Sequence, residues 1–491
     1  MKRFAFLFLT LFSVSFFGCT DLGEGVFDRQ VADDFYATPE GINAALADLY
    51  NEIRGDFGGK GVAGADRGWF DMNEVSTDEM LIPTRSDGAW DDNGIWRQFY
   101  RHEWNPAQEF VNNTWNWLYR SVFKANLAVE LLTDANAEES RIAEAKVLRA
   151  YFYYMLMDAY GEIPFYTQNN ITVDQIPQAD RATVYDFVVQ ELTENVEKLS
   201  EVKSGEFYGR FNKWAGYALL AKVYINAEVY TGTPRWTEAI AACDKIINEG
   251  GFSLVNGADY FTMFADDHRT GPSAQEVILA IFIDANTAPR NIIGIRSLRG
   301  AQGEALFGFS TWNGATVHRS FVDRYENNDL RKAQWITGPQ AGGVNYTLDI
   351  SSLNNAGVED GARNTKFLPV EPYNGGAASN DFPIYRYADI LLMKAEAAFR
   401  LGQTGTALTL VNEIRARANA TQLLSLSLND IYDERGRELC WEGHRRQDMI
   451  RFGTFNAGRD FKPTSDATRR IFPLPQSALD TNPNLVQNPG Y

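Results

Sequence analysis

The chain has 491 residues, of which 45% are apolar and 22% charged, so it can form a large packed core and is not a disordered chain. Its formal net charge of −18 argues against a nucleic-acid-binding protein, because such proteins gather lysine and arginine on one face. The three cysteines, Cys19, Cys243 and Cys440, stand far apart, which excludes a disulfide-rich scaffold and a zinc or thioredoxin-type motif.

The N-terminus has the pattern of a bacterial lipoprotein signal. A short basic start precedes an uncharged run over 4–17, which suits a secretory signal and is too short to span a bilayer. Gly18 and Cys19 follow, and a small residue before a cysteine at this distance is typical of a lipoprotein cleavage site. We therefore expect a signal peptide over 1–18, lipidation of Cys19 and a short leash over 19–38. An ordinary signal peptide followed by a chance cysteine is the alternative.

Helical and loop-rich stretches alternate along the rest of the chain. Thr38 and Pro39 suit the N-cap and first position of a helix, and helical spacing of apolar residues recurs in later stretches. Gly, Asn and Asp clusters interrupt this pattern over 55–106 and again over 250–383, where strand-like runs such as 276–283 occur. The sequence predicts helices over 39–53, 113–132, 137–160, 183–199, 212–230, 236–248, 385–401, 404–418 and 428–451.

Two of the predicted helix pairs have small and apolar residues at related spacings. In the second pair the step from Ala395 to Ala407 is that of a tetratricopeptide repeat, and the turn of the first pair is six residues longer. Simple amphipathic helices are the alternative interpretation. If the two pairs are repeats, Cys243 is a core residue without redox chemistry. The positions are Ala221, Tyr224, Ala239, Cys243 and Ile246 in the first pair and Ala395, Ala398, Ala407, Val411 and Ile414 in the second.

The body over 39–491 therefore divides into two kinds of region. We expect a helical scaffold mainly at 113–249 and 384–451. A loop-rich part lies mainly at 55–110 and 250–383. Loops held by a rigid scaffold are where binding groups concentrate, so we look for the binding site in this second part.

Several segments together resemble the SusD-like (RagB/SusD) lipoproteins of Bacteroidetes. The resemblance covers nearly the whole mature chain, and its segments occur in the family's order. The most specific are PIYRYADILLMKAEA at 383–397, ERGREL at 434–439 and EGHR at 442–445. The others are EAKVLRAYFYY at 144–154 with YGEIP at 160–164, NKWA through AKVY at 212–224, and NPNL through NPGY at 482–491.

The resemblance implies a mostly α fold, in which about four tetratricopeptide-like helix pairs form a scaffold and a large loop-rich part contains short strands. It also implies a place on the outer face of the outer membrane, reached through the lipid anchor. Members of the family bind a nutrient, most often an oligosaccharide, and act as a lid over a SusC-like TonB-dependent transporter.

The residues able to support catalysis form no catalytic pattern. Glu434, Glu438 and Glu442 lie four apart on one helix face, and paired carboxylates are the groups that glycosidases use. Arginines beside them favour helix-surface ion pairs instead. The histidines, His444 included, have no metal-binding or triad-like context, and residues 284–290 lack a full calcium-binding loop. We expect no enzymatic activity, no cofactor and no specific metal.

Sugar binding requires flat aromatic side chains for the apolar ring face and Asn, Asp or Arg for the hydroxyl groups. Two loop-rich stretches, 69–96 and 309–313, offer both, and they correspond roughly to regions where SusD-like proteins contact glycans. For each tryptophan there, packing beneath a loop is as plausible as stacking on a sugar. The predicted ligand-binding residues are Trp69, Asp78, Arg85, Trp90, Asp91, Asn93, Trp312 and Asn313.

We expect a surface lipoprotein that captures an oligo- or polysaccharide and delivers it to an outer-membrane transporter. The acidity of the chain favours a neutral glucan over a sulfated or uronic polymer. A tetratricopeptide adaptor that binds a partner protein and no glycan is the alternative, and a glycosidase is a third hypothesis. The tryptophans within predicted helices are expected in the core: Trp115, Trp117, Trp214 and Trp236.

Overall fold

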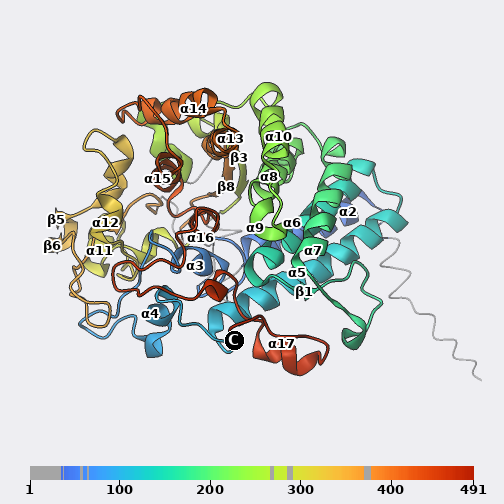
Figure 1. Cartoon of the computed structure of the whole chain (residues 1–491), viewed down its shortest axis with the longest axis horizontal. Coiled ribbons are helices and arrows are strands. Elements are labelled where there is room, and N and C mark those ends of the chain that lie inside the picture. The colour runs from blue at the N-terminus through green and yellow to red at the C-terminus, as the bar shows by residue number, and fades with distance from the viewer. Residues whose placement is uncertain are drawn as a thin grey trace, which may run out of the picture.

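The computed structural model of the chain describes residues 35–36, 38–55, 59–63, 66–265, 270–284, 291–369 and 378–491. The expected signal peptide, Cys19 and most of the leash lie outside these described residues. The described part is mostly helical with short strands, as the sequence predicts (Figure 1). None of its helices is long and apolar enough to cross a membrane.

Helices form the framework of the protein. α6 packs against α5 and α7, α8 packs on α10, and α10 and α14 both pack on α13, so the pairs follow one another across Figure 1. The α-helices are α2 (Pro39–Arg54), α3 (Trp69–Glu74), α4 (Ile95–Tyr100), α5 (Glu109–Asp134), α6 (Glu139–Tyr160), α7 (Arg181–Asn195), α8 (Lys213–Ile225), α9 (Ala227–Thr231), α10 (Trp236–Glu249), α11 (Gly300–Phe307), α12 (Arg319–Val322), α13 (Tyr387–Arg400), α14 (Thr404–Arg417), α15 (Leu428–Leu439), α16 (Arg445–Arg451) and α17 (Gln476–Thr481).

The strands form antiparallel pairs, each of two strands. In the longest pair every residue of both strands is buried, and one strand coincides with the strand-like run predicted over 276–283. The pairs are β1 (Ile163–Pro164) with β2 (Gln178–Ala179), β3 (Val277–Ile281) with β8 (Phe382–Arg386), β4 (Trp335–Ile336) with β7 (Arg363–Asn364), and β5 (Gly338–Gln340) with β6 (Val344–Tyr346).

Helix α6 is buried on all sides from residue 143 to residue 160, apart from the half-buried Lys146. Its polar side chains are therefore paired, because an unpaired buried charge is costly. Glu144 accepts two hydrogen bonds from the Arg210 guanidinium, and Arg149 donates two to Glu191. These pairs fix α6 in the centre of the helical scaffold.

The predicted helix pairs are confirmed, although the single helix predicted over 212–230 is wrong, because the chain breaks at Asn226 between α8 and α9. Thr38 caps α2 by accepting a hydrogen bond from the Gly41 backbone N–H. The small and apolar positions of both repeat-like pairs are fully buried, with the exception of the half-buried Tyr224. Cys243 is a core residue, and burial raises the pKa of its thiol, which keeps the thiol protonated and unreactive.

The single helix predicted over 428–451 is wrong, because the chain forms α15 and α16 with a break between them. Trp441 and Gly443 in this break have positive φ angles of 61° and 80°. The backbone N–H of Trp441 donates to Glu79 and that of Gly443 donates to Glu74, so contacts from α3 and its following turn hold the break. The helices α3 and α4 were not predicted, because six residues are too few to show a helical period.

Candidate functional site

Two loop segments far apart in the sequence lie side by side at the candidate site. Leu81 and Thr316 exchange both backbone hydrogen bonds, at 2.9 and 3.0 Å. The next residues of the first segment bond to a third segment, where Thr84 donates to Leu353 and accepts from Ala356. The stretch 69–96 therefore pairs through its backbone with Thr316, three residues beyond the stretch 309–313.

Trp90 and Trp312 form the centre of the site. The indole N–H of Trp90 donates a 2.7 Å hydrogen bond to the carbonyl oxygen of Trp312, and the ring centroids are 6.4 Å apart. Both side chains are half-buried, so each keeps part of its surface in contact with solvent. We call this pair of rings the aromatic platform. Its geometry suits a ligand with an apolar face, such as a pyranose ring.

Buried groups support the platform from behind. Trp96 is fully buried and meets the Trp90 ring edge-to-face at 5.4 Å. Trp90 also lies against Gly314, where a Cβ would clash with the ring at 2.4 Å. The glycine thus allows the ring to lie directly on the backbone of the neighbouring segment.

Arg85 and Asn313 belong to this support and do not face a ligand. Arg85 is 1% exposed and donates hydrogen bonds to four backbone carbonyls, those of Asn313, Gly314, Gly357 and Asp360. Asn313 is 8% exposed and bonds to Val358 and Arg363. The sequence-based expectation that they bind the ligand directly is corrected, because burial commits both side chains to the loops.

Exposed polar side chains surround the platform. Asp91 accepts a 2.9 Å hydrogen bond from Arg97 and a 3.3 Å bond from the Thr84 hydroxyl, and it remains exposed. Asn93 is exposed in a left-handed turn with φ of 54°. Both side chains are therefore accessible to solvent on the segment 85–94, which carries Trp90.

Trp69 and Asp78 lie elsewhere, at the contact between α3 and α16. The Trp69 ring packs against Gly443. Asp78 accepts hydrogen bonds from Arg445 and Arg324. Burial alone would raise the pKa of Asp78, but these two arginines hold it well below its usual value. Both residues contact neighbouring structural elements and are half-buried, and their role in ligand binding stays a prediction.

The three glutamates also differ from the expectation, because Glu434, Glu438 and Glu442 are all buried, and Glu442 lies in the break after α15 and not on its face. Burial would raise the pKa of Glu434, but Arg331, Arg437 and Arg415 lower it to about 2. A carboxylate held ionised in this way cannot donate a proton as a glycosidase acid does. We call these carboxylates and their cationic partners the α15 cluster: Glu434, Glu438, Glu442, Arg331, Lys366, Arg386, Arg415, Arg417 and Arg437.

The histidines and acidic residues that the structure describes form no metal site. His444 is buried, and desolvation with the nearby Lys222 lowers its pKa to about 4, so it is neutral. Within the described ranges, no group of three or more His, Cys, Asp or Glu side chains could hold a metal ion. Residues 285–290, considered above for calcium, lie outside those ranges.

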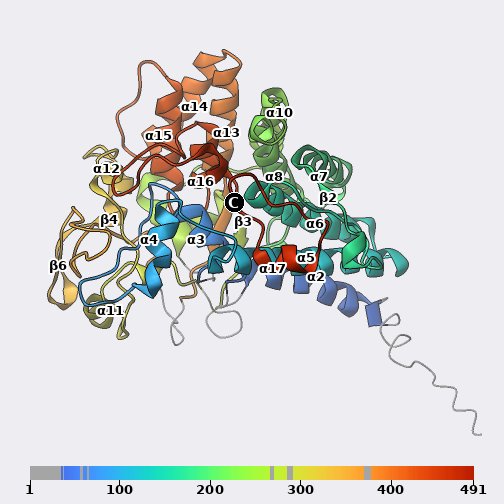
Figure 2. The same ribbon diagram turned by 60° about the horizontal axis from the view of Figure 1, so that its bottom comes forward.

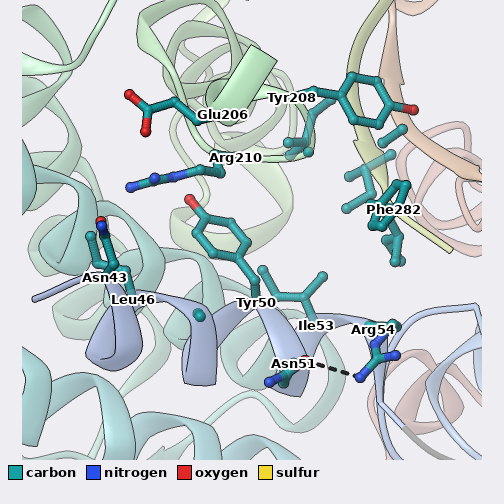
Figure 3. Close-up of a pocket in the computed structure, with 16 residues that line it drawn as sticks. Asn43, Leu46, Tyr50, Asn51, Ile53, Arg54, Glu206, Tyr208, Arg210 and Phe282 are labelled. Carbon is teal, nitrogen blue, oxygen red and sulfur yellow. Dashed lines mark hydrogen bonds between the residues drawn. The ribbon is translucent and has the colours of Figure 1, made fainter. Parts of the chain in front are cut away.

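A cavity of about 430 Å³ opens between α2, β3 and residues 206–210 (Figure 3). Its floor is apolar, but charged side chains line it, and Figure 3 shows Arg210 above the Tyr50 ring and Arg54 bonded to Asn51. Tyr50 and Arg210 both donate to Glu144 and are thereby committed to the fold. We call this cavity the α2–β3 pocket. It shares no lining residue with the aromatic platform.

Comparison with known proteins identifies the family. The model of the SusD family matches residues 305–491, and a model described as "Starch-binding associating with outer membrane" matches residues 60–225. The chain belongs to the SusD family. The starch-binding protein SusD of Bacteroides thetaiotaomicron is 27% identical, in a match that covers 88% of this chain and 87% of that protein.

Solved SusD-like structures have the same fold as this chain. Surface glycan-binding protein A from Bacteroides thetaiotaomicron superposes with a TM-score of 0.78 at 21% identity, covering 93% of this chain and 100% of that one. The same protein in complex with laminarihexaose gives a TM-score of 0.74 at 20% identity, covering 92% and 99%. These relatives are named as binding proteins and not as enzymes, in agreement with the expectation that this SusD-like chain catalyses no reaction.

Proposed function

We propose that this SusD-like protein is a cell-surface lipoprotein that binds a neutral glycan and passes it to a TonB-dependent transporter in the outer membrane. The observation that carries the proposal is the aromatic platform. Trp90 and Trp312 come from segments more than 200 residues apart, are locked together by a hydrogen bond, and keep exposed surface. By contrast, the neighbouring Trp96 is buried completely.

The polar surroundings of the platform support a neutral ligand. Asp87, Asp91 and Asp92 are all exposed on the segment that carries Trp90. Arg97 pairs with Asp91 at 2.9 Å and Arg67 pairs with Asp92 at 3.2 Å, so the nearby cations are already engaged. A sulfated or uronic chain would have to compete with these aspartates for Arg97 and Arg67 and would also meet the exposed Asp87, whereas a neutral sugar can donate its hydroxyl hydrogens to the carboxylates.

The relatives support a glucan as the ligand class. One is named as starch-binding, one structural neighbour was solved with laminarihexaose, and another is named as laminarin-binding. Anchoring through Cys19 and delivery to a SusC-like transporter belong to the same proposal, since the matched family model is described as associating with the outer membrane. The lipid would hold the body at the surface where a transporter lies.

The test is binding of soluble starch, laminarin and a uronic polymer to the purified protein, by affinity gel electrophoresis and calorimetry. Trp90→Ala and Trp312→Ala should each weaken binding of a neutral glucan by at least about tenfold, or roughly 1.4 kcal/mol. Phe123→Ala, which removes an aromatic ring that is 48% exposed on α5, is the matched control and should change nothing.

Failure of the protein to bind any glycan would contradict the proposal. Recovery of an outer-membrane barrel protein in pull-downs, with no glycan retained, would then favour the adaptor hypothesis. Release of reducing sugar from any of these polymers would establish a glycosidase.

A further inference from the structure

A second cavity of about 430 Å³ lies between α5, the segment that contains β1, and α17. Figures 1 and 2 both show α17 running beside α5 near the C-terminus. We call this cavity the α5–α17 pocket. Its size is within the range of roughly 300–1,000 Å³ that small-ligand sites occupy. None of its lining residues belongs to the segments of the aromatic platform.

The lining of the α5–α17 pocket contains aromatic rings and uncharged polar groups. Trp115, Tyr119 and Tyr166 supply the rings, and the centroids of the first two are 4.6 Å apart. Asn116, Ser477 and Thr481 contribute an amide and two hydroxyl groups at its edge. No charged side chain lines it among the described residues. The pocket therefore suits a neutral ligand with an apolar face and several hydroxyl groups.

The α2–β3 pocket has the same volume but different chemistry. Arg54, Glu206 and Arg210 line it (Figure 3). The hydroxyl groups of its two tyrosines, Tyr50 and Tyr208, are bonded to Glu144 and Asp381, and Arg210 is bonded to Glu144 as well, so these groups are committed to the fold and not to a sugar. Volume alone thus does not distinguish the two cavities, whereas the lining side chains do.

Polar groups of the α5–α17 pocket have hydrogen-bonding capacity to spare. The Asn116 amide is exposed, and neither it nor the Tyr166 hydroxyl makes a hydrogen bond within the described part of the chain. The Ser477 hydroxyl donates to Asn112 and that of Thr481 donates to the Ser477 carbonyl, so both oxygens can still accept. Sugar hydroxyl groups both donate and accept, and match this set.

The walls of the pocket are fixed to one another. The backbone N–H of Gln476 donates to the Pro106 carbonyl at 3.1 Å, which ties α17 to the start of α5. The Tyr119 hydroxyl donates to the Pro164 carbonyl at 2.8 Å, which ties α5 to β1. Binding in such a preformed pocket avoids the cost of ordering loops.

We propose that the α5–α17 pocket is a second carbohydrate site, which takes one or two residues of a neutral sugar. A long glycan held at the platform could then be held by this pocket as well, and two contacts raise the overall affinity for a polymer above that of either alone. The inference rests on the proposed function, because both sites are proposed to bind glycans. The two sites share no residue, so each can be tested separately.

The experiment uses Ala478→Trp, which places an indole in the pocket from the half-buried first turn of α17. Saturation-transfer NMR on the purified protein should detect maltose, cellobiose or laminaribiose in a Trp90→Ala/Trp312→Ala background. Adding Ala478→Trp should remove that signal, and adding Tyr166→Ala should weaken it. In the otherwise unchanged protein Ala478→Trp should lower affinity for the polymer severalfold. Glucuronic acid should give no signal in any variant.

The matched control is Ala47→Trp, which fills the equally large α2–β3 pocket from an exposed helix position and should leave sugar binding unchanged. Melting temperatures and sedimentation are recorded for every variant. Unaltered sugar signals with Ala478→Trp would overturn the second site while leaving the platform proposal intact. If Ala478→Trp abolishes a dimer or the binding of a protein partner but leaves sugar binding intact, the pocket is a protein contact and the second-site proposal is overturned. Absence of any glycan binding in the unchanged protein would overturn both proposals.

Discussion

Carboxylates pair with arginines both beside the aromatic platform and in the α15 cluster, yet the two regions differ in how those groups are used. In the α15 cluster Glu434, Glu438 and Glu442 are almost fully buried, and each is paired with two or more cations. Around the platform the aspartates are exposed and Trp90 and Trp312 retain accessible surface. Pairing and exposure, not residue type, thus separate a structural cluster from a surface that can bind a ligand.

The largest expected effect is the loss of a charge from the α15 cluster. Glu438→Ala leaves Arg331, Arg386 and Arg417 without one of their partners in a buried setting. We expect the free energy of unfolding in urea to fall by about 3–5 kcal/mol. The control is Glu238→Ala, which removes the exposed pair with Arg235 and should cost less than about 1 kcal/mol. Equal effects of the two substitutions would contradict the comparison.

A smaller effect is expected where the platform is supported. Arg85→Met removes the hydrogen bonds to four backbone carbonyls and leaves those carbonyls buried. We expect the protein to lose about 2–4 kcal/mol of stability and to bind neutral glucan more weakly. Trp312→Ala should weaken glucan binding with little change in melting temperature. If Arg85→Met changes neither stability nor binding, the support that we assign to it is wrong.

The smallest expected effect depends on pH. Burial raises the pKa of Glu79 to about 7, although Arg445 opposes this shift, and burial also raises the pKa of the neighbouring Glu74. The folded protein therefore keeps a proton that the unfolded chain releases above its ordinary pKa of 4.5. This contribution to stability is complete below pH 4.5 and is lost as the pH rises to about 7.

Glu79→Gln removes this proton and isolates its effect from that of other groups, such as His444. The free energy of unfolding of the variant, minus that of the unchanged protein, should rise by about 1–2 kcal/mol as the pH increases from 5 to 8. Urea unfolding at pH 5, 6, 7 and 8 measures this difference. Glu238→Gln, at an exposed position, should show a difference that is constant with pH. A constant difference for Glu79→Gln as well would contradict the assigned shift.

Much of the scaffold could be predicted from the sequence, because its signals are local. Helical spacing located α2, α10, α13 and α14 to within a few residues of their observed ends. The tryptophans expected in the core are buried: Trp115, Trp117, Trp214 and Trp236.

What could not be predicted depends on contacts between distant parts of the chain. Glu438 meets Arg331, which precedes it by 107 residues, and no local pattern indicates that this pair is buried. Asp78 has the same residue type as the exposed Asp91, but only the folded chain shows Arg445 and Arg324 against it. The sequence predicts that Trp90 and Trp312 belong to binding regions, which stays a prediction, and it does not indicate that the two residues are in contact.

The left-handed backbone of Trp90, with φ of 61°, has a kinetic consequence. Such a conformation costs about 1–3 kcal/mol for a residue with a side chain, so it persists only because the surrounding structure enforces it. On this backbone, the hydrogen bond from the indole N–H to the Trp312 carbonyl holds the ring in one orientation. Binding of a sugar then requires no slow rearrangement of the ring. This arrangement favours rapid capture, so differences in affinity between glycans should appear mainly in their dissociation rates.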